Sequence, residues 1–308
     1  MNYPKKQHPL LNSYQFNDML ITTGFTLTSH CFIFNTIKRL IISVFLLCVP
    51  ASAASIESAL DLASIYANMV DKRLDLPAED NNDYANRIID TLNEAGLNDL
   101  PAQYILVVDR SPMVQAIFLY WIDSDAVPKL IGASPVSTGH PGRFDYFETP
   151  TGVFRHSLDN LDFRAEGTKN SNGIRGYGIK GMRVFDFGWQ QAIKGWGNGG
   201  VSTMRLQMHA TDPDLLENRL GTAQSKGCIR IPATLNLFID QYGLLDADYE
   251  KALDEGHLFW MLDPKRQPTR WSGRYLIVLD TLRTERPAWA PAPRLSSRSD
   301  RINQSDKH

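Results

Sequence analysis

The stretch MHATDPDLLENRLGTAQSKGCIRIP, from Met208 to Pro232, contains the residues on which the predicted fold and chemistry depend. Its cysteine, Cys228, follows a glycine and precedes Ile229 and Ile231, which alternate as apolar residues do in a strand. Glycine permits a tight turn, and such a turn can hold a thiol exposed. Cys228 is therefore the first candidate for a reactive residue.

His209 is the residue of this stretch that can serve Cys228 as a base. The thiolate is the nucleophilic form of cysteine, and a thiol with a pKa of about 8.5 is mostly protonated at neutral pH unless a base or a cation assists it. Residues 204–209 alternate like a strand that ends at His209, and residues 212–214 begin a polar connection. Two strands joined in this way bring the pair together. By spacing alone, a buried thiol and an unrelated histidine explain the pattern as well.

The order of His209, fifteen intervening residues and the motif SKGCIR at 225–230 resembles the signature of the L,D-transpeptidase catalytic domain, also called the YkuD domain. Residues 104–109, 135–139 and 149–154 resemble the early strands and turns of that family, in the expected order. The resemblance covers about residues 101–282. It implies a mainly β fold, an L,D-transpeptidase-like β-sandwich with short helices, to which this chain adds an N-terminal helical pair.

The resemblance also implies an activity, that of an exported cysteine acyltransferase acting on peptidoglycan stem peptides. Cys228 would attack a peptide carbonyl and form a thioester, while His209 would remove the thiol proton and protonate the leaving amine. An acceptor amine or water would then resolve the thioester, so that L,D-peptide links are formed or exchanged. A peptidoglycan hydrolase, which trims an amino acid as an L,D-carboxypeptidase or releases a wall-attached protein, would use the same pair. A non-catalytic wall-binding module would need neither residue.

Four further residues of the motif are predicted to take part in the site. The backbone N–H groups of Gly227 and Cys228 are expected to donate hydrogen bonds to the tetrahedral oxyanion. Arg230 either holds a substrate carboxylate through its bidentate fork or forms a structural ion pair. Ser225 and Lys226 are the other predicted substrate-binding residues.

Two positions depart from the family pattern. Ala210 stands where the family often has glycine, but its backbone carbonyl can still orient the His209 imidazole, because a carbonyl needs no particular side chain. Lys226 stands where the family usually has histidine. Its ammonium would stabilise a thiolate at Cys228 or bind a substrate carboxylate. Alternatively, it is a solvated lysine that points away from the cleft.

Composition places the chain among globular proteins. Its 308 residues, of which 43% are hydrophobic, can bury a substantial core. The formal net charge of −2 and the pI near 6.4 give no electrostatic case for nucleic-acid binding. The sequence contains no HExxH, no CxxC and no clustered His/Asp set, so no metal and no other cofactor is predicted.

The N-terminus has the pattern of a secretory signal peptide. Two basic residues at 38–39 precede an apolar run at 40–49 and small residues at 50–53. We expect cleavage after Ala53 and export to the periplasm or cell envelope, with an uncleaved anchor as the alternative. Cleavage would remove the other two cysteines, so the mature protein would have Cys228 as a free thiol and no internal disulfide.

The remaining chain divides into three regions: 54–100, 101–282 and 283–308. Helical spacing in the first predicts a helical hairpin packed on the main domain or, alternatively, a docking module. The second is the predicted catalytic domain. The third has little apolar content and is predicted to be disordered.

Within residues 101–282, short apolar runs bounded by turn residues predict strands, and helical spacing predicts two short helices. The glycine-rich, aromatic segment 159–200 is expected to be a functional loop or lid. Its Trp189 and Trp196 either line the cleft or complete the core. The predicted strands are 104–108, 114–122, 129–137, 153–156, 258–262 and 275–279, and the predicted helices are 233–242 and 246–256.

Overall fold

Continuous apolar runs build the centre of the first β-sheet. The computed structural model describes residues 58–123 and 126–291. β1 (Gln103–Asp109) is buried along its whole length, and β2 (Ala116–Asp123) is buried at every residue but the last. Strands covered on both faces need such uninterrupted sequence. The first two predicted strands are therefore confirmed as the middle of a sheet.

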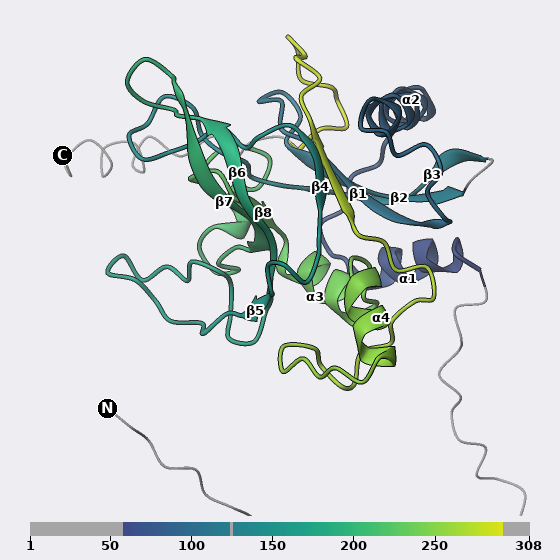
Figure 1. Cartoon of the computed structure of the whole chain (residues 1–308). Coiled ribbons are helices and arrows are strands. Elements are labelled where there is room, and N and C mark those ends of the chain that lie inside the picture. Colours follow the sequence, from purple (N-terminus) through teal and green to yellow (C-terminus); the bar gives the residue numbers. More distant parts are fainter. Residues whose placement is uncertain (1–57, 124–125, 292–308) are drawn as a thin grey trace, which may run out of the picture. The chain divides into compact units, whose positions relative to one another are not determined.

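The first sheet contains five strands in the order β3-β2-β1-β9-β4. β1 pairs antiparallel with β2 and parallel with β9, so the sheet is mixed. β9 comes from the far end of the chain and lies between β1 and β4, as the yellow strand in Figure 1 shows. The bounds of the other three strands are β3 (Ala126–Pro135), β4 (Gly152–Arg155) and β9 (Tyr275–Leu279).

The second sheet contains four strands in the order β5-β6-β7-β8. β7 pairs antiparallel with β6 and parallel with the short edge strand β8. With two mixed sheets and no barrel, the described chain is mainly β and consistent with a β-sandwich. The strands are β5 (Phe163–Arg164), β6 (Arg183–Ile193), β7 (Val201–Ala210) and β8 (Ile229–Ile231).

The side chains of β1 alternate between two apolar clusters. Leu106 and Val108 join a cluster that includes Phe185 of β6 and Leu206 and Met208 of β7. The intervening residues of β1 face a second cluster on the other side of the sheet. Each fully buried side chain of this size stabilises the fold by roughly 1.5–3 kcal/mol. One face of β7 is therefore anchored in the core, and the side chains of residues 205, 207 and 209 lie on its other face.

The described residues contain four α-helices. α1 (Asp61–Met69) and α2 (Ala78–Glu94) are the predicted N-terminal pair, while α3 (Ala233–Gln241) and α4 (Ala247–Asp254) are the two helices predicted after the cysteine. No helix within residues 58–123 and 126–291 is both long and apolar enough to cross a membrane.

The expected helical hairpin is wrong, because α1 and α2 cover opposite faces of the first sheet (Figure 1). Leu62 and Tyr66 of α1 join the cluster shared with the second sheet, and Tyr66 packs edge-on against Phe238 of α3 at 5.3 Å. α2 packs on the other face through Tyr84 and Ile88. Each helix thus completes a different part of the core.

Two predicted elements differ in the structure. Residues 258–262 form an irregular segment with a turn at 260–261 and not a strand. Phe259 packs against Tyr249 of α4 at 5.0 Å, and Met261 and Leu262 join the same small cluster beside that helix. The long segment expected as a loop contains β6, because Phe185 and Phe187 face the core between the sheets. The lid interpretation is therefore wrong for residues 183–193.

The prediction of a disordered tail is also wrong for residues 283–291. Arg283 forms an ion pair of 2.6 Å with Asp80, and Trp289 packs edge-on against Tyr84 at 6.2 Å and Phe118 at 5.9 Å. Apolar and charged contacts to α2 thus order this segment. The rest of the tail and the predicted signal peptide lie outside the described residues.

Candidate active site

Parallel pairing between β7 and β8 brings the two predicted catalytic residues together. In the register, Met208 lies opposite Ile229 and His209 lies opposite Arg230. Cys228 directly precedes β8 and reaches across to the preceding part of β7. Its Sγ donates to the carbonyl of Arg205 at 3.8 Å and accepts a hydrogen bond from the backbone N–H of Gln207. The thiol is therefore held against residues 205 and 207 of β7, which precede His209 by four and two positions in the sequence.

Gly227 is required by the geometry of the turn that presents Cys228. Its φ is +129°, and an added Cβ would lie 2.6 Å from Sδ of Met204 and 3.2 Å from Cβ of Phe147. Its carbonyl accepts a hydrogen bond of 2.7 Å from the Thr149 hydroxyl. Thr149 lies in the loop that precedes β4. The turn therefore has no room for a side chain and is tied to a distant loop.

Ser225 lies inside the turn. Its buried hydroxyl donates to the carbonyl of Cys228 at 2.5 Å and accepts the backbone N–H of Gly227 at 3.0 Å. The Ser225 side chain thus supports the turn and does not face a substrate. The predicted oxyanion role of the Gly227 N–H is wrong, because this N–H already donates to the Ser225 hydroxyl. The backbone N–H of Cys228 has no hydrogen-bond partner within the described chain. It is the donor that remains for an oxyanion.

His209 is oriented by its own backbone neighbour. Its Nδ1 donates to the carbonyl of Ala210 at 2.7 Å, as predicted from the sequence, and this leaves Nε2 as a proton acceptor. The side chain is only 4% exposed. Burial lowers the pKa of His209 to about 4, and the charge of Arg230 acts in the same direction. The imidazole is therefore neutral at physiological pH and can accept a proton.

The Cys228 thiol is also neutral at rest. Burial raises the pKa of Cys228, and the carboxylate of Asp186 adds to this effect. The N–H of Gln207 and the charge of Arg230 oppose it without reversing it. The two groups are thus a thiol and a neutral imidazole at rest and not a thiolate and an imidazolium.

Arg230 is a partly buried cation without an anionic partner. Neither a carboxylate nor any other side chain accepts a hydrogen bond from its guanidinium within the described residues. Burial lowers the pKa of Arg230, although arginine remains charged at any physiological pH. A desolvated, unpaired charge is costly in free energy. The predicted alternative of a structural ion pair therefore has no support, and an anion-binding role fits the geometry.

Lys226 lies on the surface. Its Nζ is 2.5 Å from a carboxylate oxygen of Asp145 and 5.6 Å from the ring centre of Tyr146, and its side chain is 60% exposed. The charged side chains that shift the pKa of Cys228 are Arg230 and Asp186. Of the two sequence interpretations, the solvated lysine therefore fits the structure.

Tyr177 belongs to the site but was not singled out by the sequence analysis. Its ring packs edge-on against the His209 ring at 4.7 Å, and its hydroxyl donates to Oε1 of Gln207 at 3.2 Å. Gln207 and Arg205 both donate to the buried carboxylate of Asp186, each at 2.7 Å. The alternation of residues 205, 207 and 209 along β7 is the sequence signal for this polar face.

The two tryptophans of the aromatic segment have different positions. Trp189 is 64% exposed and lies opposite Arg205 in the pairing of β6 with β7, so it is at the rim of the site and outside the core. Trp196 packs edge-on against Phe147 at 5.0 Å, and Phe147 borders the Gly227 turn. Neither tryptophan completes the core between the sheets.

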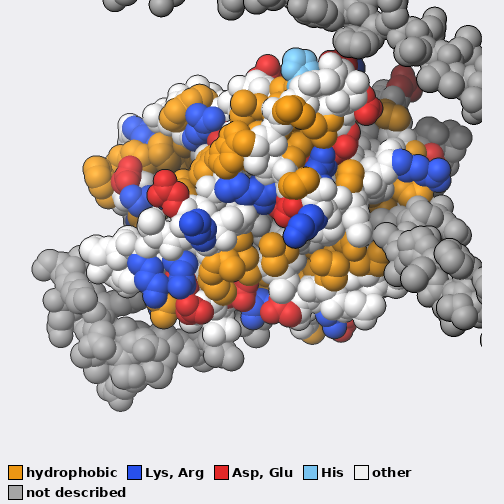
Figure 2. All heavy atoms as spheres, turned by 90° about the horizontal axis from the view of Figure 1, so that it is seen from below, with side chains coloured by type: hydrophobic (Ala, Val, Ile, Leu, Met, Phe, Trp, Pro, Cys, Tyr) orange, Lys and Arg blue, Asp and Glu red, His pale blue; other side chains and the backbone are white. Residues whose placement is uncertain are grey.

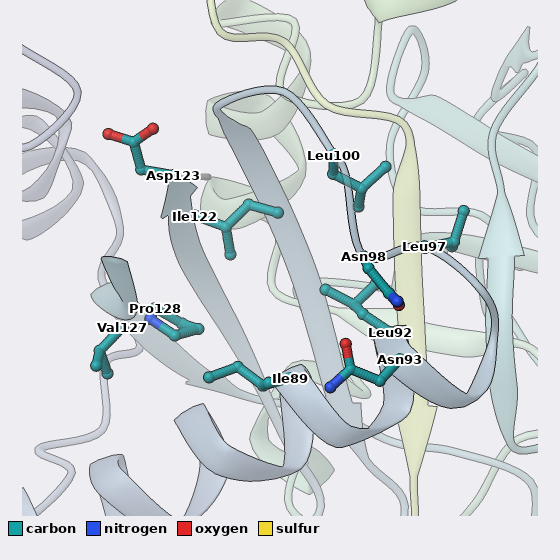
Figure 3. A pocket seen from close by; sticks show the side chains of 10 residues that line it. All are labelled: Ile89, Leu92, Asn93, Leu97, Asn98, Leu100, Ile122, Asp123, Val127 and Pro128. Carbon is teal, nitrogen blue, oxygen red and sulfur yellow. The ribbon is translucent and has the colours of Figure 1, made fainter. Parts of the chain in front are cut away.

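A hollow of about 340 Å³ beside α2 is remote from these residues. Figure 3 shows Ile89 and Leu92 of α2 facing Ile122 at the end of β2, with Leu97 and Leu100 beside them. This hollow lies on the face of the first sheet that α2 covers, whereas Cys228 and His209 belong to the second sheet. It shares no residue with the site.

The scan against protein-family models gives no match, and the search of curated proteins gives none either. Within the described residues, no three His, Cys, Asp or Glu side chains are placed to hold a metal ion.

Proposed function

We propose that this protein is a cysteine acyltransferase of the L,D-transpeptidase type that acts on peptidoglycan stem peptides, with the β-sandwich of that family as its finer fold. One observation carries the proposal: the half-buried thiol of Cys228 is hydrogen-bonded to β7 two and four residues before His209, whose Nε2 is free, and the charge of the unpaired Arg230 guanidinium acts on both residues. This combination supplies a nucleophile, a base and an anion-binding group.

Substrate binding begins at Arg230. A free carboxylate of a stem peptide forms charge-assisted hydrogen bonds with the guanidinium and relieves the cost of its burial. The same carboxylate screens the charge that lowers the pKa of His209. His209 thereby becomes a stronger base when the substrate is in place, which couples binding to activation of the thiol.

Acyl transfer then proceeds in two halves. Sγ of Cys228 attacks the peptide carbonyl while Nε2 of His209 takes the thiol proton, and the oxyanion accepts a hydrogen bond from the N–H of Cys228. The intermediate collapses to a thioester as the imidazolium gives its proton to the leaving amine. An acceptor amine attacks the thioester, His209 takes its proton, and the free thiol is restored together with a new peptide bond.

The setting of this reaction is part of the proposal. Peptidoglycan lies outside the cytoplasmic membrane, so the activity requires export to the periplasm or envelope, which agrees with the signal-peptide pattern that ends at Ala53. The catalytic residues need no cofactor for this chemistry.

Mass spectrometry of purified muropeptides incubated with the protein tests the activity. Transfer predicts cross-linked or amino-acid-exchanged products that are absent with the Cys228→Ala variant. Shortened stem peptides as the sole product would instead establish the hydrolase. Unchanged muropeptides under conditions where the thiol reacts with iodoacetamide would contradict both activities.

A further inference from the structure

A hollow of about 450 Å³ adjoins the site through Tyr177. It lies between the loop that follows β5 and the turn that contains Trp260. Figure 2 shows the molecule from below the view of Figure 1, with hydrophobic side chains in orange among arginine and lysine side chains in blue. The volume is within the range of about 300–1,000 Å³ typical of small-molecule sites. Its main lining side chains are Phe163, Arg164, Glu166, Thr168, Tyr177 and Trp260.

Trp260 presents an aromatic surface on a fixed backbone. The side chain is 75% exposed, but its neighbours Phe259 and Met261 are held in the cluster around Tyr249. In addition, Nε of Arg164 donates to the carbonyl of Met261 at 2.6 Å. The backbone that carries the indole is therefore held in place, which lowers the ordering cost when a ligand stacks on Trp260.

The hollow also offers polar groups. Glu166 and Thr168 have exposed side chains that form no side-chain hydrogen bond within the described residues. The positive charge of Arg164 is already neutralised, because its guanidinium forms an ion pair with the carboxylate of Asp240. The uncompensated charge in the hollow is therefore the carboxylate of Glu166. This disfavours anionic ligands, including stem-peptide carboxylates and lipid phosphates, and suits a neutral ligand rich in hydroxyl groups.

We propose that this hollow binds a sugar ring of the N-acetylhexosamine class, from the glycan to which the stem peptide is attached. The apolar C–H face of a pyranose ring stacks on Trp260, while its hydroxyl and amide groups bond to Glu166 and Thr168. This inference rests on the proposed function, since Tyr177 connects the hollow to His209. A sugar site in this hollow would make the enzyme prefer stem peptides that are still attached to the glycan, a preference that Cys228, His209 and Arg230 do not by themselves produce.

Titration of the full chain with an N-acetylglucosamine tetramer, followed by calorimetry, tests sugar binding without any need for turnover. Trp260→Ala should weaken binding about tenfold, as expected for the loss of one aromatic contact. Leu258→Ala is the matched control, because Leu258 is 92% exposed in the same turn but does not line this hollow. It should bind as wild type does. Absence of tetramer binding to wild type, or equal binding by Trp260→Ala, overturns the inference.

A kinetic comparison separates this inference from the proposed function. Trp260→Ala should lower kcat/KM about tenfold for a disaccharide-linked tetrapeptide and leave the free tetrapeptide unchanged. An equal loss on both substrates contradicts the sugar site. If wild type binds the tetramer through Trp260 but turns over neither peptide, the acyltransferase proposal fails while the sugar site stands.

Discussion

Arg230 lies directly opposite His209 in the parallel pairing of β8 with β7, and its guanidinium has no carboxylate partner in the described chain. Its charge lowers the pKa of His209 and opposes the rise in the pKa of Cys228. This cation thus adds to the effect of burial on the pKa of His209, opposes the effect of burial on the pKa of Cys228, and remains free to bind an anion.

Arg230→Gln should therefore change both binding and protonation. We expect kcat/KM for a carboxylate-bearing stem peptide to fall roughly 10- to 100-fold, because a hydrogen bond to a charged group contributes about 1.5–3 kcal/mol. The pKa values of Cys228 and His209 should both rise. Steady-state kinetics and the pH dependence of iodoacetamide labelling measure these effects. Unchanged kinetics would remove Arg230 from substrate binding.

Lys226→Met should leave the Cys228 thiol unaffected, because the lysine pairs with Asp145 at the surface. The pH profile of iodoacetamide labelling should overlap that of wild type, whereas the Arg230→Gln profile should shift to higher pH. A shift of similar size in the Lys226→Met profile would show that the lysine activates the thiol after all.

His209→Asn should keep the fold and lower turnover by about 10²–10⁴-fold, the range for loss of a general acid–base. Because the folded pKa of His209 is depressed to about 4, its neutral form contributes stability that is present above the unfolded pKa of about 6.5 and is lost as pH falls toward 4. Urea unfolding between pH 4 and 7 should show this loss in wild type and less of it in the variant. A pH dependence identical in both proteins would mean that His209 is not buried in its neutral form.

The contribution of His156 to stability against unfolding should have the opposite pH dependence to that of His209. Its Nδ1 faces the carbonyl of Leu245 at 2.9 Å and its Nε2 faces Asp162 at 2.8 Å, so both nitrogens act as donors and the ring is protonated. Burial would lower the pKa of His156, but the charge and hydrogen bond of Asp162 raise it. Arg183, Asp246 and the ring of Tyr249 also face it from β6 and the region of α4.

With His156 protonated, this buried cluster balances four cations against four carboxylates. Stability from His156 is present below the unfolded pKa and is lost as pH rises through the raised folded pKa. The melting temperature should fall above about pH 6.5, and His156→Gln should remove this part of the dependence. The exposed His257→Gln is the control and should behave as wild type. The cluster consists of Arg164, Arg183, Arg266, His156, Asp162, Asp240, Asp246 and Glu250.

Gly227→Ala should destabilise the turn that presents the thiol. At φ +129° the new Cβ is strained by about 1–3 kcal/mol and also clashes with Met204. Gly256→Ala is the matched control, since Gly256 has φ +90° but nothing within 4 Å of the added Cβ. Chemical unfolding should show a larger loss for Gly227→Ala. Equal losses would mean that the contact with Met204 relaxes at little cost.

The central strands and the turn before Cys228 could be predicted because their signals are local. Seven consecutive buried residues in β1 specify a covered strand, and a glycine before the cysteine specifies the turn. Residues 258–262 have an equally apolar pattern, but they pack beside α4, and a run of five residues does not distinguish these outcomes.

The rest of the site depends on tertiary contacts. Tyr177 and Trp260 line the same hollow although 83 positions separate them in the sequence. The periodicity of apolar residues does not predict that two such distant residues lie close together. The inward direction of Ser225 and the lack of a partner for Arg230 are likewise properties of the folded chain. A polar side chain in a short motif does not by itself show whether it faces the substrate or the turn.

Intact-mass analysis of the protein incubated with a donor tetrapeptide tests directly whether Cys228 carries the acyl group. We predict an acyl adduct of the protein, located by peptide mapping at Cys228 and absent from the Cys228→Ala variant, which also lacks turnover. Wild-type turnover by Cys228→Ala, or an adduct located at another residue, would rule out a thioester at Cys228 as the reaction intermediate.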